Sequence, residues 1–207
     1  MTSAVANGNG TAGVELEQYQ ILEQCGFMTS EREGGRKEQA LEWEHNFVHR
    51  TGSPDTPMSR SNFVADMTQR GYDPAWSLAT FRGTDIDGSG AINLHEYILS
   101  RAALDYDADR DSGTPLVDLR LRVAYFFYDR DGDGKLERST ELRELVRELA
   151  AGDSHVDRLM QLLPTEADEL TLEGFVKTAL GAFHAAGLSS RDLLRKPTRQ
   201  PQRTVLE

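Results

Sequence analysis

The segment DIDGSGAINLHE, residues 85–96, carries oxygen-bearing side chains at alternate positions and closes on a glutamate. Asp85, Asp87 and Ser89 stand at its positions 1, 3 and 5, and Glu96 stands at position 12. Calcium takes about six to eight oxygen ligands, and a loop with this spacing wraps around one ion. We therefore expect Asp85, Asp87, Ser89, the backbone carbonyl of Ala91 and Glu96 to hold calcium.

Two other residues of this segment fit the backbone that such a loop requires. Gly90 stands at position 6, where the chain turns sharply and a β-carbon is costly. Asn93 is a good helix N-cap and a ligand through water, and Glu96 follows it at the capping-box position. The same segment thus closes an ion site and starts a helix, which disfavours the alternative of a solvated acidic turn.

A second acidic segment, DRDGDGKLERSTE, covers residues 129–141. Its glutamate, Glu141, lies one position late, because Thr140 occupies position 12. We interpret this as a one-residue insertion that delays the following helix, with Ser139 or Thr140 as its cap. The expected calcium ligands are then Asp129, Asp131, Asp133, the carbonyl of Lys135 and Glu141, with Glu137 at the edge of the site.

Both segments resemble EF-hand loops, and the preceding LRVAYFFYD resembles the entering helix of calmodulin-type hands. The resemblance implies helix–loop–helix calcium sites that occur in pairs. The calmodulin-like, calcineurin-B-like and recoverin-like proteins are the nearest types. The recoverin-like glycine at residue 2 and the Cys-Pro of the first loop are absent here, so the resemblance extends only to the superfamily.

Two degenerate copies of the pattern flank the acidic segments. An aromatic or aliphatic residue precedes each loop, and an aliphatic residue follows at position 8, which gives loops 51–62 and 163–174. The four loop starts are separated by 34, 44 and 34 residues, which indicates two pairs. We expect an all-α fold of four EF-hand units in two paired lobes. Short antiparallel bridges should pair Met58 with Ile92 and Leu136 with Leu170.

The two outer loops are poor ion sites. Loop 51–62 has Asn62 at position 12 and contains two prolines, and loop 163–174 begins with Leu163 and ends with Gly174. Neither supplies enough carboxylates to replace the water around a divalent ion. We expect both loops to be structural.

These features divide the chain into five segments. The first segment should be flexible, with an extra helix within residues 14–30 and a hinge at EGGRKE. The basic tail is open to several interpretations, namely folding back, partner binding or phosphorylation at Thr198 or Thr204, but we favour a solvated tail. The segments are 1–37, the N-lobe 38–104, an acidic linker 105–115, the C-lobe 116–187 and the tail 188–207.

Composition narrows the functional classes. The 207 residues carry a net charge of −11, which argues against nucleic-acid binding. The single cysteine, Cys25, permits no internal disulfide, no stretch is apolar enough to span a membrane, and the first residues do not resemble a secretory signal. We expect a cytoplasmic protein. The sequence offers no catalytic constellation, so we expect no enzymatic activity.

Alternative sites are weaker. His45 and His49 have the spacing of a helical zinc pair but lack the HExxH glutamate, so we expect them to be polar residues around a buried Phe47. Trp43 and Trp76 are expected in the core of the N-lobe.

The favoured function is a calcium sensor that changes conformation on binding and engages an amphipathic helix of a target protein. Magnesium is the expected competitor. The alternatives are a calcium buffer, or a regulatory subunit of a calcium-controlled enzyme such as a phosphatase or kinase. A photoprotein-like role is a weaker option. In a sensor, calcium should expose apolar residues such as Leu94, Ile98, Leu145 and Val146.

Overall fold

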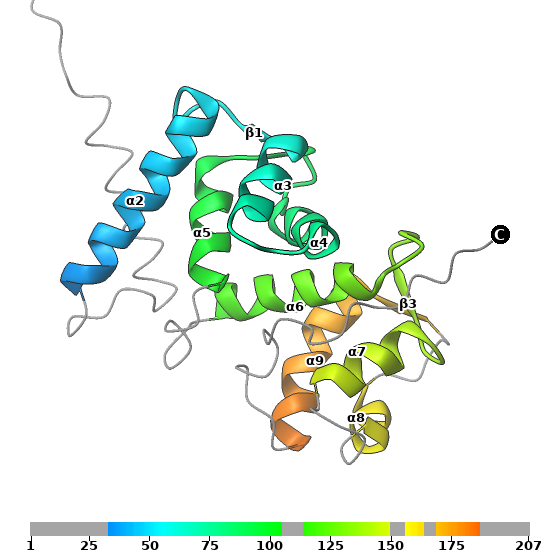
Figure 1. The fold of residues 1–207 in the computed structure, drawn as a ribbon. Helices are drawn as coiled ribbons and strands as arrows, with labels where there is room; N and C mark the ends of the chain where they lie inside the picture. The colour runs from blue at the N-terminus through cyan, green and yellow to red at the C-terminus, as the bar shows by residue number, and fades with distance from the viewer. Residues whose placement is uncertain (1–32, 105–113, 150–155, 164–168, 187–207) are drawn as a thin grey trace, which may run out of the picture.

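The computed structural model describes residues 33–104, 114–149, 156–163 and 169–186. Over these residues the protein is mostly helical, with two small antiparallel sheets (Figure 1). The expectation of a predominantly helical fold is therefore confirmed. Outside the described residues lie the proposed extra helix within 14–30, most of the linker 105–115 and the whole tail 188–207.

The first half of the fold alternates helices with very short strands. Helix α2 precedes strand β1, and helix α4 precedes strand β2. Each strand is followed by a further helix. The elements are α2 (Glu33–Thr51), β1 (Met58–Ser59), α3 (Arg60–Gln69), α4 (Pro74–Thr84), β2 (Ala91–Ile92) and α5 (Leu94–Leu104).

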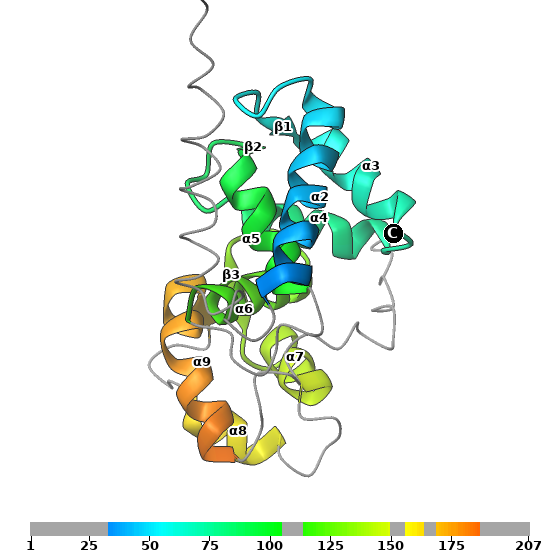
Figure 2. The same ribbon diagram turned by 90° about the vertical axis from the view of Figure 1, so that its left-hand side faces the viewer.

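The second half repeats this order of helix, strand and helix. Helix α6 runs across the middle of the molecule, with α2–α5 on one side of it and α7–α9 on the other (Figures 1 and 2). The elements are α6 (Thr114–Tyr128), β3 (Lys135–Glu137), α7 (Glu141–Leu149), α8 (Val156–Leu162), β4 (Glu169–Thr171) and α9 (Leu172–Ala186).

The two sheets have the register that the sequence predicts. In the first, Met58 lies opposite Ile92. In the second, Leu136 lies opposite Leu170. All four side chains are buried, so each bridge ties two consecutive loops together over an apolar core.

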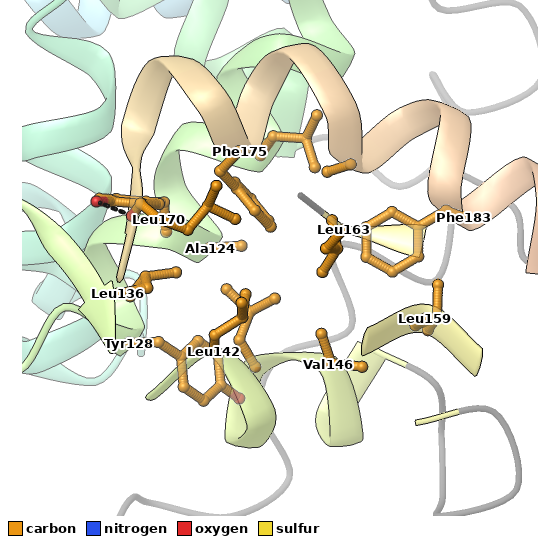
Figure 3. Close-up of a cluster of buried hydrophobic side chains, with 14 of the residues drawn as sticks. Ala124, Tyr128, Leu136, Leu142, Val146, Leu159, Leu163, Leu170, Phe175 and Phe183 are labelled. Atoms are coloured by element: carbon orange, nitrogen blue, oxygen red, sulfur yellow. Dashed lines mark hydrogen bonds between the residues drawn. The ribbon is translucent and has the colours of Figure 1, made fainter. Parts of the chain in front are cut away.

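Two apolar clusters form the interior. The first contains Trp43 and Phe47 of α2 and Tyr97 of α5. The second lies among α6, α7, α8 and α9, whose side chains converge in Figure 3, with Phe175 and Phe183 reaching in from α9. Burial of these aromatic and aliphatic side chains is the main stabilising term for such short helices.

Helices α4 and α6 contribute to both clusters. Phe81 of α4 belongs to the first cluster, whereas Trp76 of the same helix belongs to the second. The Trp76 ring packs edge-on against Phe127 of α6, with 5.0 Å between ring centroids. Trp76 is thus buried as expected, but the expectation that it joins the first core is wrong, because α4 presents this face to α6.

The crossing of α4 and α6 is close. Gly83 lies directly against Val123, and Nε of Arg122 donates a hydrogen bond of 3.0 Å to the carbonyl oxygen of Gly83. Glycine at this point lets the two backbones approach each other. The crossing therefore brings the end of α4 and the end of α6 together, and each end leads into one of the acidic segments.

The hinge expected at EGGRKE is wrong, because α2 already begins at Glu33. Two glycines in the first turn cost about 1 kcal/mol each relative to alanine. Burial of Ala40, Trp43 and Phe47 farther along the helix offsets this cost. Among the helices of the described ranges, none is long and apolar enough to cross a membrane.

Candidate functional site

The first acidic segment forms a turn between α4 and β2 that gathers its carboxylates. Asp85, Asp87 and Glu96 each offer an oxygen, and these oxygens all lie within 4.8 Å of one another. Asp87 is exposed, whereas Glu96 is only 4% exposed. The group thus combines an open side with a buried carboxylate at its base.

Backbone amides hold the Glu96 carboxylate in place. Its Oε1 accepts a hydrogen bond of 2.9 Å from the amide of Ile86, and its Oε2 accepts one of 3.1 Å from the amide of Asn93. In return, the amide of Glu96 donates to Oδ1 of Asn93 at 2.9 Å. The predicted capping box is therefore confirmed. Each carboxylate oxygen keeps a further lone pair that a cation can use.

The remaining polar groups of this loop are also ordered by its own backbone. With φ near 80°, Gly90 turns its amide toward Oδ2 of Asp85 at 3.0 Å. Ser89 donates its amide proton to Oδ1 of Asp87 at 2.9 Å and its hydroxyl proton to the carbonyl of Ala91 at 2.9 Å. Hydrogen bonds from Ser89 lower the pKa of Asp87. The structure thus brings all five predicted residues of this loop to one turn.

The second acidic segment repeats these contacts between α6 and β3. Oxygens of Asp129, Asp131 and Asp133 lie within 4.8 Å of one another. The amide of Asp133 donates to Oδ1 of Asp131 at 3.1 Å, and the amide of Lys135 donates to Oδ1 of Asp133 at 2.8 Å. Gly134 has a φ of 82°, matching Gly90. The two loops therefore share one backbone design.

Glu141 occupies the place in this loop that Glu96 has in the first. Its carboxylate accepts hydrogen bonds from the amides of Arg130 at 2.9 Å and Glu137 at 3.3 Å. Helix α7 begins at Glu141, so the predicted delay of the helix is confirmed. Burial raises the pKa of the Glu141 carboxyl, and the charges of Asp131 and Asp129 raise it further. Among the described acidic residues, however, Glu141 is outside the group that the three aspartates form.

The capping of α7 differs from the prediction in its details. The carbonyl of Thr140 accepts the first helical hydrogen bond, from the amide of Glu144 at 3.0 Å, so Thr140 takes the N-cap position. Its hydroxyl does not cap a helix amide but donates to Oε2 of Glu137 at 2.7 Å. Ser139 is exposed. The hydroxyl of the inserted Thr140 therefore holds the Glu137 side chain at the edge of the site by a hydrogen bond.

Asp129 has a partner that sequence reasoning misses. Its Oδ2 accepts a hydrogen bond of 2.7 Å from Nη2 of Arg82, which lies in the last turn of α4. The Asp129 side chain is fully buried, and its Oδ1 has no hydrogen-bond partner within the part of the chain that the structure describes. A buried carboxylate oxygen without a partner is costly, and a cation ligated there would remove that cost.

A second arginine lies near the first loop, but Nε of Arg122 donates to the carbonyl oxygen of Gly83 rather than to a carboxylate. Arg122 of α6 faces the first loop, where the carboxylates of Asp85 and Glu96 favour its charge. Burial has the larger effect and lowers the pKa of Arg122. Arg82 and Arg122 are separated from their partners by many residues, so no local motif indicates either contact.

The donor set of both loops fits a hard divalent cation. It consists of carboxylates, one hydroxyl and backbone carbonyls, without sulfur or imidazole. The carboxylates repel one another in each loop, and Oδ1 of the buried Asp129 has no hydrogen-bond partner among the described residues. The residues that would hold the cation are those predicted from the sequence. Glu141 is one of them because the amides of Arg130 and Glu137 hold its carboxylate at the loop.

The other predicted regions behave differently. In loop 51–62, the Thr51 hydroxyl lies within hydrogen-bond distance of the carbonyls of Phe47 and Ser53, and no group of metal-ligating side chains forms among its residues. Much of loop 163–174 lies outside the described residues. His45 and His49 are exposed beside the buried Phe47, as predicted.

Comparison with known proteins gives one point of reference. No protein-family model matches this chain. The chain is similar to a guanylyl cyclase inhibitory protein of Lithobates pipiens, with 29% identity over 137 residues. The match covers 66% of this chain and 62% of that protein, so the chain spans about three-fifths of the length of this curated relative.

Proposed function

We propose that the chain is a calcium-binding protein with four EF-hand units, of which the two middle loops, 85–96 and 129–141, each hold one ion. The observation that carries this proposal is the repetition of one hydrogen-bonding scheme in two acidic loops. In each loop a glutamate accepts the amides of positions 2 and 9, and position 3 accepts the amide of position 5. The buried, unpartnered oxygen of Asp129 supports it independently.

Each ligand has a definite role in this proposal. The carboxylates at positions 1 and 3 and the side chain at position 5 supply one side of the shell. The carbonyls of Ala91 and Lys135 supply the opposite side, and Glu96 and Glu141 close it with two oxygens each. Affinity in the sensor range of about 10⁻⁷–10⁻⁵ M follows for loops with this number of charged ligands.

We further propose that the protein is a sensor and that it engages an amphipathic helix of a target protein. Without an ion, repulsion among the carboxylates opposes closure of each loop. An ion that draws them together also moves α5 and α7, which begin at or near the closing glutamates. Leu94, Ile98, Leu145 and Val146 are buried on these two helices, so a change in their packing exposes apolar surface.

Isothermal titration calorimetry with calcium tests the ion sites. We expect two ions per chain, and one ion for the Glu96→Gln and Glu141→Gln variants, with binding at the altered loop weakened at least about tenfold. Asn62→Ala, which changes position 12 of the degenerate loop 51–62, is the matched control and should keep both ions. Titration in excess magnesium measures competition. A count of three or four ions would show that the outer loops also bind.

A second candidate is the regulation of an enzyme. The similarity to a protein named for inhibiting guanylyl cyclase favours this class over a calcium buffer. Calcium-dependent binding of an apolar dye separates the two, because a buffer binds the ion without exposing apolar surface. A guanylyl cyclase assay with and without the purified chain, at low and high calcium, then tests the specific enzyme.

A further inference from the structure

Arg82 places a positive charge from α4 inside the second acidic loop. Its guanidinium donates to Oδ2 of Asp129, the residue at position 1 of loop 129–141. It also lies over the ring of Phe126, with its Cζ 4.4 Å from the ring centroid. The Asp129 side chain is 0% exposed and that of Arg82 is 31% exposed. This is therefore a largely desolvated ion pair rather than a surface contact.

The backbone fixes Arg82 in this position. Gly83, the next residue, packs directly on Val123, and its carbonyl is bonded to Arg122. Because both neighbouring contacts join α4 to α6, the guanidinium cannot leave Asp129 by a simple sliding of one helix past the other. Only the side chain of Arg82 itself can withdraw, toward its exposed side.

At position 1 of the first loop, no arginine among the described residues hydrogen-bonds the carboxylate, although the charge of Asp85 acts on Arg122. Oδ2 of Asp85 accepts the amide of Gly90, from its own loop, at 3.0 Å. At Asp129 the corresponding oxygen is taken by a cation from another element, and only Oδ1 is left without a partner. The two loops thus differ at position 1, the first ligand of the ion site, although the backbone contacts of the closing glutamate and of position 3 match.

We propose that Arg82 is a resident cation of loop 129–141 that competes with calcium for Asp129 and weakens binding at this loop. The inference rests on the proposed calcium function of the loop. An ion on Oδ1 and a guanidinium on Oδ2 share one carboxylate, and like charges at that separation repel each other strongly in a desolvated site. Calcium must therefore displace the guanidinium or bind against its charge.

The position of Arg82 also links the two loops. Arg82 lies on α4 three residues before Asp85, which begins the first loop. An ion in loop 129–141 that displaces the Arg82 side chain breaks the contact between Asp129 and the last turn of α4, the helix that enters loop 85–96. Any such coupling acts equally in both directions, so occupancy of the first loop alters the affinity of the second.

The test measures calcium affinity at loop 129–141 alone, in a full-length Glu96→Gln background that silences the first loop. Adding Arg82→Gln should tighten binding about tenfold, because a competing positive charge is removed. Adding Arg82→Lys, which keeps the charge, should leave the affinity close to that of the background. Arg143→Gln is the matched control, since it removes an arginine from an exposed pair with Asp157 in the same half of the protein.

The outcomes are distinct. Unchanged or weaker binding in Arg82→Gln, with the fold intact by circular dichroism, would overturn the role of Arg82 while leaving the calcium function standing. Equal tightening in Arg143→Gln would also overturn it, because a general charge effect would then explain the result. If the Glu96→Gln background binds no calcium at all, the proposed function of loop 129–141 fails, and this inference fails with it. Should Arg82→Gln not fold, a loss of binding in the charge-retaining Arg82→Lys would overturn the proposal.

Discussion

A β-carbon built on Gly83 would lie 2.8 Å from Cγ2 and 2.9 Å from the backbone nitrogen of Val123. No real β-carbon approaches a backbone atom so closely, so α4 and α6 would have to separate to admit one. This crossing holds the two halves of the protein together, because α4 and α6 are the helices that contribute to both apolar clusters.

The first prediction follows from this crossing. Gly83→Ala should destabilise the protein by about 1–3 kcal/mol, since the added methyl group overpacks the contact with Val123. Gly181→Ala is the control, because Gly181 is an exposed residue of α9 with nothing within 4 Å of a built β-carbon. That change should stabilise the protein by about 0.5–1 kcal/mol. Urea unfolding of both variants measures the difference, and equal stabilities would contradict the close crossing.

The second prediction concerns the charge of Glu141 without calcium. Burial raises the pKa of this carboxyl above its ordinary value of 4.5, so its charged form is disfavoured in the folded state. Glu141→Gln should therefore raise the melting temperature of the calcium-free protein at neutral pH. The sign follows from linkage: the destabilisation is fully present above the folded pKa and disappears below the unfolded value of 4.5.

Thermal melts in a chelator at pH 7 and at a pH below 4.5 check this prediction. The gain of the variant should vanish at the lower pH, where the wild-type carboxyl is protonated. In calcium at neutral pH the order should reverse, because the variant loses a ligand. A variant that is less stable than wild type under all of these conditions would show that the two amide bonds outweigh the burial of the charge.

The sequence predicts much of the fold because its signals are local. The register of Met58 with Ile92 and of Leu136 with Leu170 follows from the apolar residue at position 8 of each loop. The capping box of Asn93 and Glu96 spans a single helical turn. The start of α7 at Glu141 follows from the one-residue shift of a glutamate and the apolar residues after it.

The features that escape prediction depend on helix crossings. Arg82 and Asp129 are 47 residues apart, and they meet only because α4 and α6 cross at Gly83. The place of Trp76 in the second cluster has the same origin. Glycines at 34 and 35 indicate a hinge by propensity, but the packing of α2 overrides that preference.

The third prediction concerns the inserted residue. Deleting Thr140 should tighten calcium binding at loop 129–141, because it restores the spacing of loop 85–96 and frees Glu137 from the Thr140 hydroxyl. Thr140→Ala, which removes only the hydroxyl, should leave the affinity within about threefold, since the N-cap contact comes from the Thr140 carbonyl. Calorimetry in the Glu96→Gln background measures both variants.

A reciprocal change provides the control for this prediction. Inserting one threonine before Glu96 gives loop 85–96 the length of its neighbour and should weaken binding there. If the deletion weakens binding at loop 129–141, the extra residue is a required part of that site. If Thr140→Ala abolishes binding, the hydroxyl has a role that its contact with Glu137 does not explain.

The fourth prediction uses Trp76 as a reporter of calcium. Its ring is 5% exposed, packs on Phe127 at the crossing of α4 and α6, and belongs to the helix that leads into Asp85. In the proposed sensor an ion in either middle loop moves α5 or α7, which contact α4 and α6, so the surroundings of the indole should change. In a Trp43→Phe variant, which leaves Trp76 as the single tryptophan, calcium should shift the emission maximum and intensity.

The same variant separates a sensor from a buffer. Emission should change at the calcium concentration at which an apolar dye begins to bind, because both report the rearrangement of the helices. Adding Glu96→Gln and Glu141→Gln together should abolish both responses. Calcium binding by calorimetry with no change in Trp76 emission and no dye binding would contradict the sensor proposal and favour a buffer, since the ion would then be held without a rearrangement of the helices.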